Sequence, residues 1–446
     1  MVRLLIPSIG QYKYVLLSYT CVLFLFSCGG SSKPTKKEIE QVNQNSTAFY
    51  VVDSLYEKSN DTIALSEFCD SLYYIPIEKA KGVAISNYSI LKISKFSLFI
   101  LILTGNGELL QFDLQGQFIR QFNPQYKYRS FDVLEKEKQI YASTDLDRIM
   151  IFDFDGNQKR RIPIPDGMSS YGNFFAVIDT NHIAIARWNV GVNKERLVII
   201  DNKGAVVKSF PNTEMFQSGN PIFINATAFH RMLFRNGNTV KYSPFYSDTL
   251  YTLTPDLELS PTFVEKIIPK VPLRHRLAYV GDLNNFNAYC REHAVYTTRF
   301  FETERYVLNI YNRAYINQTL PNYLLYDKKT GKLYNYEQQL ILEGNWWFGL
   351  LNDIDGGLCF MPEVGDDNYY SSDNELIIAY NPVAFKKHYL KGRSARSCKG
   401  DVCKTIQHKL ATHIVSDEKS ERYLKDMVSK IDSNSCLLLA IVKFKK

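Results

Sequence analysis

The chain has 446 residues, of which 45% are hydrophobic and 14% aromatic, and its formal net charge is +7. The hydrophobic share is ample for a large core, and the 30 Tyr and 28 Phe suit half-buried strands. The 53 basic and 46 acidic residues form no dense Lys/Arg stripe, which argues against a nucleic-acid-binding protein.

The first 27 residues have the features of a secretory signal. A basic segment precedes an apolar run at residues 15–26, which is too short for a comfortable membrane span. The run ends in LFSC at residues 25–28, which resembles the lipobox of bacterial lipoproteins. This resemblance implies that residues 1–27 are a lipoprotein signal peptide and that Cys28 carries the lipid. An ordinary cleaved leader with an incidental cysteine is the alternative.

Residues 28–60 are polar and predict a flexible tether between the lipid and a folded domain at 61–446. We therefore expect an exported protein that is anchored to the bacterial envelope, at the outer membrane, and that contacts the membrane through its lipid alone. Acidic residues after the cysteine mark surface export in some related lipoproteins. The sequence here is GGSSK, which leaves the periplasmic and surface faces open.

One pattern recurs along the rest of the chain: an apolar strand, an Asp-x-x-Gly turn and a second strand. Such turns lie at residues 113–116, 153–156 and 201–204, with a variant at 327–331 and a weaker copy at 248–259. The first three glycines are spaced by 40 and 48 residues. One hairpin cannot bury its own apolar face, so this repeat predicts stacked four-stranded units, as in an all-β, six-bladed β-propeller.

The two ends of the domain are expected to pair and close the ring. A lone strand at 72–77 and a last strand at 436–444 would otherwise leave open edges. Pro76 fits an edge strand, and antiparallel pairing would put Cys69 and Cys436 at opposite ends, against a disulfide between them. The six predicted units are about 83–122, 128–165, 174–210, 222–265 and 294–339, and a sixth that starts at Trp347 and includes both terminal strands.

Residues 382–433 depart from the strand pattern and predict a small helical insertion before the last strand. Within it, residues 417–431 carry apolar side chains at helical spacing, and Ser416 is a suitable N-cap. We expect this helix to pack on the propeller rather than to bind a partner.

The long loops are expected on the face opposite the Asp-x-x-Gly turns. They lie at 188–195, 267–291 and 309–322, and long loops on a rigid scaffold often carry function. Aromatic rings and arginines there predict binding of a glycan, a peptide or an envelope protein. Wedging of the rings between blades is the alternative. The candidate ligand-binding residues are Arg187, Trp188, Tyr246, Arg299, Trp346 and Trp347.

A cluster of cysteines and histidines near the C-terminus has three interpretations. Cys398, Cys403, His408 and His413 are spaced by five residues each and can be placed around zinc. The spacing differs from the tight pairs of zinc fingers. A local disulfide between the two cysteines suits an exported protein, and free thiols are the third possibility.

A second possibility for function is catalysis at the mouth of the propeller channel. Six-bladed propellers include calcium-dependent lactonases, and Asn225, Glu302 and Asn352 offer the oxygen ligands that Ca²⁺ prefers. A solvated channel explains these residues equally well. No Gly-x-Ser-x-Gly elbow or phosphate loop is present in the sequence. The sequence favours a binding protein over an enzyme, with a metal-dependent hydrolase of lactonase type as the alternative. It assigns no cofactor, and Ca and Zn stay open.

The order of these features resembles the six-bladed β-propeller lipoproteins of Bacteroidetes, whose functions are mostly unassigned. The resemblance rests on the lipobox, the tether and the lone strand SLYYIPIE, on the repeated turns, and on the ending DSNSCLLL at 432–439. In that ending Ser435 stands where proline is expected. The resemblance implies the fold and an envelope location, and it transfers no catalytic residue.

Overall fold

The chain divides into two units, Met1–Ala48 and Phe49–Lys446. The computed structural model describes residues of the second unit only, so the predicted signal peptide and Cys28 lie outside the described residues. No helix in the described part is long and apolar enough to cross a membrane. The described residues are 50–52, 64–80, 82–83, 85, 90–165, 174–187, 193–213, 215, 233–244, 247, 249–265, 277–278, 282, 284–285, 288–289, 297–312, 322–337, 340–341, 346–347, 352, 354, 369–372, 374–383, 385–386 and 418–446.

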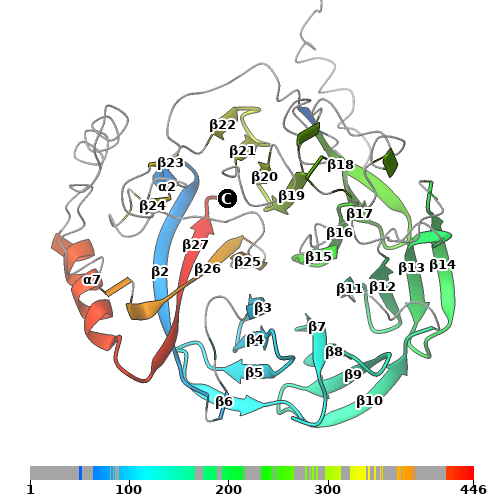
Figure 1. Cartoon of the computed structure of the whole chain (residues 1–446), viewed down its shortest axis with the longest axis horizontal. Coiled ribbons are helices and arrows are strands. Elements are labelled where there is room, and N and C mark those ends of the chain that lie inside the picture. The colour runs from blue at the N-terminus through cyan, green and yellow to red at the C-terminus, as the bar shows by residue number, and fades with distance from the viewer. Residues whose placement is uncertain are drawn as a thin grey trace, which may run out of the picture. The chain divides into compact units, whose positions relative to one another are not determined.

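Six antiparallel blades surround one axis within the second unit, which confirms the predicted β-propeller (Figure 1). Each blade pairs four consecutive strands, except where the ring closes. In blades one to three the strands run from the axis outward as β3 (Ile90–Lys95), β4 (Ile100–Thr104), β5 (Leu109–Phe112) and β6 (Phe118–Gln121); β7 (Tyr128–Leu134), β8 (Gln139–Thr144), β9 (Arg148–Asp153) and β10 (Gln158–Pro163); and β11 (Phe174–Val177), β12 (His182–Ala186), β13 (Glu195–Asp201) and β14 (Val206–Pro211).

Blades four and five follow the same order, and blade four gains a fifth strand at its outer edge. That strand, β1 (Tyr50–Val52), pairs in parallel with β18. Strand β1 lies within residues 28–60, the segment predicted as a tether. The strands are β15 (Leu233–Asn236), β16 (Thr239–Tyr242), β17 (Thr249–Leu253) and β18 (Leu259–Glu265), then β19 (Thr297–Glu302), β20 (Tyr306–Asn312), β21 (Asn322–Asp327) and β22 (Leu333–Glu337).

The sixth blade closes the ring with strands from both ends of the unit. Its order from outside to inside is β2 (Cys69–Glu78), β27 (Ser435–Phe444), β26 (Glu375–Tyr380) and β25 (Tyr369–Ser372). Figure 1 shows the blue β2 beside the red β27. The two strands are antiparallel, with Cys69 opposite Phe444, so Cys69 and Cys436 are far apart in register, and neither is in a disulfide. The predicted closure is confirmed, and Pro76 lies in the edge strand.

The predicted start of the sixth blade was wrong. Trp346–Trp347 forms strand β24, which pairs with β23 (Leu340–Ile341) in a separate hairpin. The inner strand of the blade is β25, which is hydrogen-bonded to β26. The apolar residues after Trp347 suggested that the inner strand begins there. The hydrogen bonds of β26 instead go to β25, the strand directly before it.

The helical prediction before the last strand is confirmed. Helix α7 (Glu418–Lys430) buries Leu424, Met427 and Val428 against β2, β26 and β27. The hydroxyl of Tyr423 also accepts a hydrogen bond of 2.9 Å from the backbone N–H of Tyr74 in β2. The helix therefore covers the outer edge of the closing blade. A short helix, α2 (Leu65–Phe68), leads into β2 and is buried in the same cluster.

The core lies between neighbouring blades rather than within one sheet. All five residues of β4 are buried, because blades on both sides cover its two faces. The outer strand β10 is exposed at every position except Ile162. The apolar runs of the sequence are thus the inner and middle strands, and the polar outer strands form the rim.

The two faces of the ring differ in their connections. Antiparallel pairing puts the turn between the first and second strands on the same side as the turn between the third and fourth strands. This side, the short-turn face, carries the turn at 135–138 and the Asp-x-x-Gly turns. The connections from β12 to β13 and from β20 to β21 leave on the opposite side, the long-loop face.

Candidate functional site

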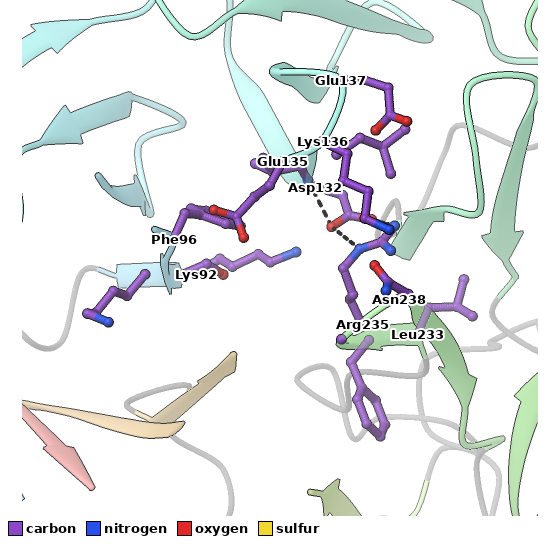
Figure 2. Close-up of a pocket in the computed structure, with 15 residues that line it drawn as sticks. Lys92, Phe96, Asp132, Glu135, Lys136, Glu137, Leu233, Arg235 and Asn238 are labelled. Carbon is purple, nitrogen blue, oxygen red and sulfur yellow. Dashed lines mark hydrogen bonds and ion pairs between the residues drawn. The ribbon is translucent and has the colours of Figure 1, made fainter. Parts of the chain in front are cut away.

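A cavity of about 280 Å³ lies where the inner strands of blades one, two and four meet (Figure 2). Its walls come from the ends of β3, β7 and β15 and from the turns that follow β7 and β15. All of these segments belong to the short-turn face. The cavity is therefore at the axis of the propeller, on the side opposite the long loops.

Asp132 and Arg235 form an ion pair across this cavity. Arg235 donates from Nε to Oδ1 of Asp132 at 3.3 Å and from Nη2 to Oδ2 at 3.1 Å. The backbone N–H of Val177 donates to the same Oδ2 at 2.7 Å, and Arg235 donates to the Val177 carbonyl oxygen. Since these residues belong to blades two, four and three, one carboxylate ties three inner strands together.

Lys92 brings a second cation to the same place. Its ammonium group donates to the carbonyl oxygen of Phe131, the residue before Asp132, and lies 4.7 Å from the centroid of the Phe131 ring. Figure 2 shows the Lys92 side chain extending from β3 toward Arg235. Blade one thus contributes a positive charge beside the ion pair of blades two and four.

The mouth of the cavity is held by further bonds between blades. Oε1 of Glu135 accepts hydrogen bonds of 2.7 Å from both the backbone N–H and the hydroxyl of Ser97. Lys95 is ion-paired with Glu375 of blade six at 2.9 Å. Lys136, next to Glu135, is exposed and lines the cavity. Bonds between blades thus hold the rim of the cavity, and Lys136 adds an exposed cation to it.

Glu302, one of the predicted metal ligands, belongs to a buried cluster of charges between blades four and five. Both carboxylate oxygens of Glu302 face ammonium groups, of Lys241 at 2.6 Å and of Lys328 at 3.1 Å, and the side chain is 3% exposed. Burial lowers the pKa of Lys328, and Glu302 opposes that shift. Glu302 is therefore engaged in ion pairs that join blades four and five, and its role as a Ca²⁺ ligand stays a prediction.

The other predicted metal ligands give no site in the described residues. Asn352 is buried, and Asn225 lies outside the residues that the structure describes. Within the described ranges no group of three or more His, Cys, Asp and Glu side chains gathers as a metal site would require. The whole cluster at Cys398, Cys403, His408 and His413 also lies outside these ranges, so the zinc and disulfide predictions stay predictions.

The predicted ligand residues of the long-loop face are only partly described. Arg187 is held within its own loop, because it donates to Glu195 at 2.7 Å and to Asn193 at 2.9 Å. Arg299 lies in β19 opposite Ile310, and Trp346 and Trp347 form β24. Trp188 and Tyr246 lie outside the described residues. Among the six, only Arg187 has a described side chain, and it does not line the axial cavity; the role of all six in binding stays a prediction.

Sequence reasoning missed Asp132, Arg235 and Lys92. Each is a charged residue inside a short inner strand, in the segments ILKISK, YRSFDVL and LFRN. That pattern is a usable signal, because a charge in a strand buried between two blades needs a partner. The sequence gives no hint which strand supplies it.

Comparisons with known proteins agree with the fold. A family model, described as a domain of unknown function (DUF4934), matches residues 49–398. No curated protein matches the sequence of the chain. The solved structure of a Bacteroides fragilis protein, described as a candidate exported protein, has a TM-score of 0.56 and 16% identity and covers 89% of this chain and 99% of its own. This similarity supports a shared fold.

Two further structures are more distant. A member of the DUF4221 family from Bacteroides vulgatus has a TM-score of 0.42 and 10% identity, over 87% of this chain and 99% of its own. BamB from Moraxella catarrhalis has a TM-score of 0.34 and 8% identity, over 60% of this chain and 71% of its own.

Proposed function

The chain belongs to the DUF4934 family of domains of unknown function, and from that premise we propose that it is an exported, lipid-anchored binding protein of the bacterial envelope. Its partner is a glycan, a peptide or an envelope protein. We propose that the partner inserts one small group into the axial cavity of the short-turn face.

Export and anchoring are supported by the N-terminal sequence. The LFSC motif ends at Cys28 and is followed by a polar segment, and the similar Bacteroides fragilis protein is described as a candidate for export. Substitution Cys28→Ser is expected to abolish labelling of the protein by radioactive palmitate and to release it from the membrane fraction. Persistence of the label in the variant would contradict the anchor.

The observation that carries the binding role is the preorganised ion pair in the cavity. Asp132 and Arg235 are fixed by three blades, and apolar side chains such as Phe96 and Leu233 line the same space. Ligand pockets in proteins combine an apolar lining with a few fixed polar groups, and they often lie at such convergent points of a fold.

Blocking the cavity tests this proposal. Asn238 lies in the exposed turn after β15 and lines the cavity, so Asn238→Trp is expected to fill the mouth without disturbing the core. Lys138→Trp, in the turn after β7 but away from the cavity lining, is the matched control. Chemical crosslinking in intact cells, followed by purification, is expected to recover a partner with the wild type and the control and not with Asn238→Trp. Equal recovery with all three proteins would refute the cavity as the binding site.

A further inference from the structure

We infer that the group which enters the axial cavity is a carboxylate, carried on a molecule the size of one sugar acid or one amino acid. This inference rests on the proposed binding role of the cavity and names the chemistry of its ligand. Its argument comes from the charges that line the cavity and from what each of them already contacts.

Arg235 is the first part of the argument. Its Nε and Nη2 donate to Asp132 and Val177, and its Nη1 makes no hydrogen bond within the described part of the chain. Because one side of the guanidinium is fixed, the other side is preorganised to donate to an incoming anion. Arginine suits this role, since its planar fork matches the geometry of a carboxylate.

The second part is the convergence of further cations. Lys92 is held one residue away from Asp132 by its bond to the Phe131 carbonyl, which keeps its positive charge beside the ion pair. Lys136 lines the cavity from the turn after β7. In Figure 2 both lysine side chains point toward Arg235. Three positive charges from three segments therefore line one small space.

The carboxylate of Asp132, which faces Arg235, is already satisfied by groups of the protein. The two oxygens of Asp132 accept from Arg235 and from backbone N–H groups. Glu135 accepts two hydrogen bonds from Ser97 through Oε1, and Glu137, in the same turn, also lines the cavity. With Asp132 satisfied, Nη1 of Arg235 and the ammonium group of Lys136 have no hydrogen-bond partner among the described residues and remain as donors at the cavity, which favours an anionic acceptor.

The size and lining of the cavity limit the ligand further. Its volume of about 280 Å³ is near the lower end of small-molecule pockets, which span roughly 300–1,000 Å³. Phe96, Leu233 and Phe234 provide apolar contact beside the cations. A single carboxylated residue with a ring or a short apolar stem fits both features.

Calorimetric titration of the purified protein with two matched pairs of probes tests the inference. The first pair is glucuronate and glucose, and the second is N-acetylalanine and its amide, so each pair differs in the carboxylate. We expect at least one acid to bind, its neutral counterpart to bind at least about tenfold more weakly, and added salt to weaken the binding. Which acid binds distinguishes a sugar source from an amino-acid source.

Variants locate the binding. Lys136→Gln is expected to lower the affinity for the acid by about two- to fivefold, as for an exposed ion pair. Lys92→Met is expected to lower it by more. Lys138→Gln is the matched control, because Lys138 is in the same turn and does not line the cavity, and it is expected to bind as the wild type does. Unchanged melting temperatures would show that all three variants are folded.

Three results would overturn the inference. The first is equal binding of the acids and their neutral counterparts, and the second is no binding of either acid at about 10 mM, which is far above the Kd of a specific site. The third is a loss of affinity in Lys138→Gln equal to that in Lys136→Gln. The failure of the carboxylate assignment is distinguishable from failure of the proposed function. If Asn238→Trp still abolishes partner recovery, the cavity binds a ligand of other chemistry. If Asn238→Trp has no effect on recovery, the cavity is not the binding site.

Discussion

Asp132 is the residue on which the geometry of the axial cavity depends. It lies in the middle of an inner strand, its side chain is 9% exposed, and its partners come from two other blades. An unpaired carboxylate at this position would destabilise the folded protein, because a buried charge loses its hydration. Hydrogen bonds from Arg235 and from the Val177 N–H replace the lost hydration of Asp132, and they hold the three inner strands together.

Removal of this carboxylate is expected to destabilise the whole ring. Asp132→Ala leaves Arg235 without its partner and the Val177 N–H unsatisfied, so we expect a loss of about 3 kcal/mol in the free energy of unfolding. Asp155→Ala, at an exposed position of an Asp-x-x-Gly turn, is the control and is expected to change it by less than about 0.5 kcal/mol. Urea unfolding followed by tryptophan fluorescence measures both, and equal losses would show that the ion pair has no structural role.

Asp327 gives a prediction about acid stability. Burial alone raises its pKa, but hydrogen bonds from Arg305 and from the backbone N–H of Lys329 outweigh burial and lower the pKa to about 2. The ordinary value is 3.8. Because the folded pKa lies below the unfolded one, this carboxylate stabilises the protein above about pH 4, and the stabilisation is lost as the pH falls toward 2.

We therefore expect the free energy of unfolding of Asp327→Asn to fall less between pH 5 and pH 3 than that of the wild type. The free energy of unfolding of Asp155→Asn should fall as much as that of the wild type. That of Asp327→Asn still falls in part, because hydrogen bonds also lower the pKa of Asp153 and Asp201 in the equivalent turns. A fall of the same size in Asp327→Asn and the wild type would contradict this role.

The limits of sequence reasoning at the residue scale follow from distance along the chain. The turn aspartates were predictable, because Asp-x-x-Gly is a local signal and each aspartate bonds to backbone N–H groups within four residues. Asp132 and Arg235 are 103 residues apart. No local pattern connects them, and only the closed ring brings them together.

At the scale of elements, each Asp-x-x-Gly turn of blades one to three has two roles. It connects the third and fourth strands of its blade, and it contacts the neighbouring blade. Gly116 has a φ of 86°, as the predicted turn requires, and its carbonyl oxygen accepts a hydrogen bond of 2.9 Å from the Glu78 N–H. A Cβ at Gly116 would lie 2.1 Å from the carbonyl oxygen of Pro76. Glycine is needed there for the backbone conformation and for the close approach of the closing strand β2.

Two glycine substitutions separate these requirements. Gly331→Ala introduces strain from a φ of 69° but meets no atom within 4 Å, so we expect a loss of about 1 to 2 kcal/mol in the free energy of unfolding. Gly116→Ala adds a clash with rigid backbone and is expected to cost at least about 2 kcal/mol more. Chemical unfolding of the two variants measures the difference. Equal losses would mean that the turn of blade one does not contact β2 closely.

The elements themselves were largely predictable from the sequence, because strands, turns and the amphipathic helix α7 each have a local pattern. The start of the sixth blade was not. Several apolar segments between residues 340 and 380 compete for the position of the inner strand, and hydrogen bonding to β26 selects β25. Strand β1 was missed for a similar reason, since three residues within a polar segment give no period to recognise.

At the scale of the whole molecule, ring closure brings the inner strands that line the axial cavity together. The closure itself was predictable, because two terminal strands with free edges have a physical reason to pair. The position of the described cavity was not: it lies on the short-turn face, whereas loop length favours the long-loop face, and binding at that face stays a prediction. The cavity arises from three inner strands that converge on the axis, and the length of a loop carries no information about that convergence.

Site-specific photocrosslinking in living cells tests most directly whether the partner binds in the axial cavity. A photoreactive amino acid is placed at Asn238 beside the cavity, at Lys194 on the long-loop face, and at Lys159 on the exposed rim. The proposed function predicts a crosslinked partner from position 238 and none from positions 194 and 159. Crosslinks from position 194 without any from position 238 would contradict it and would place recognition on the long-loop face.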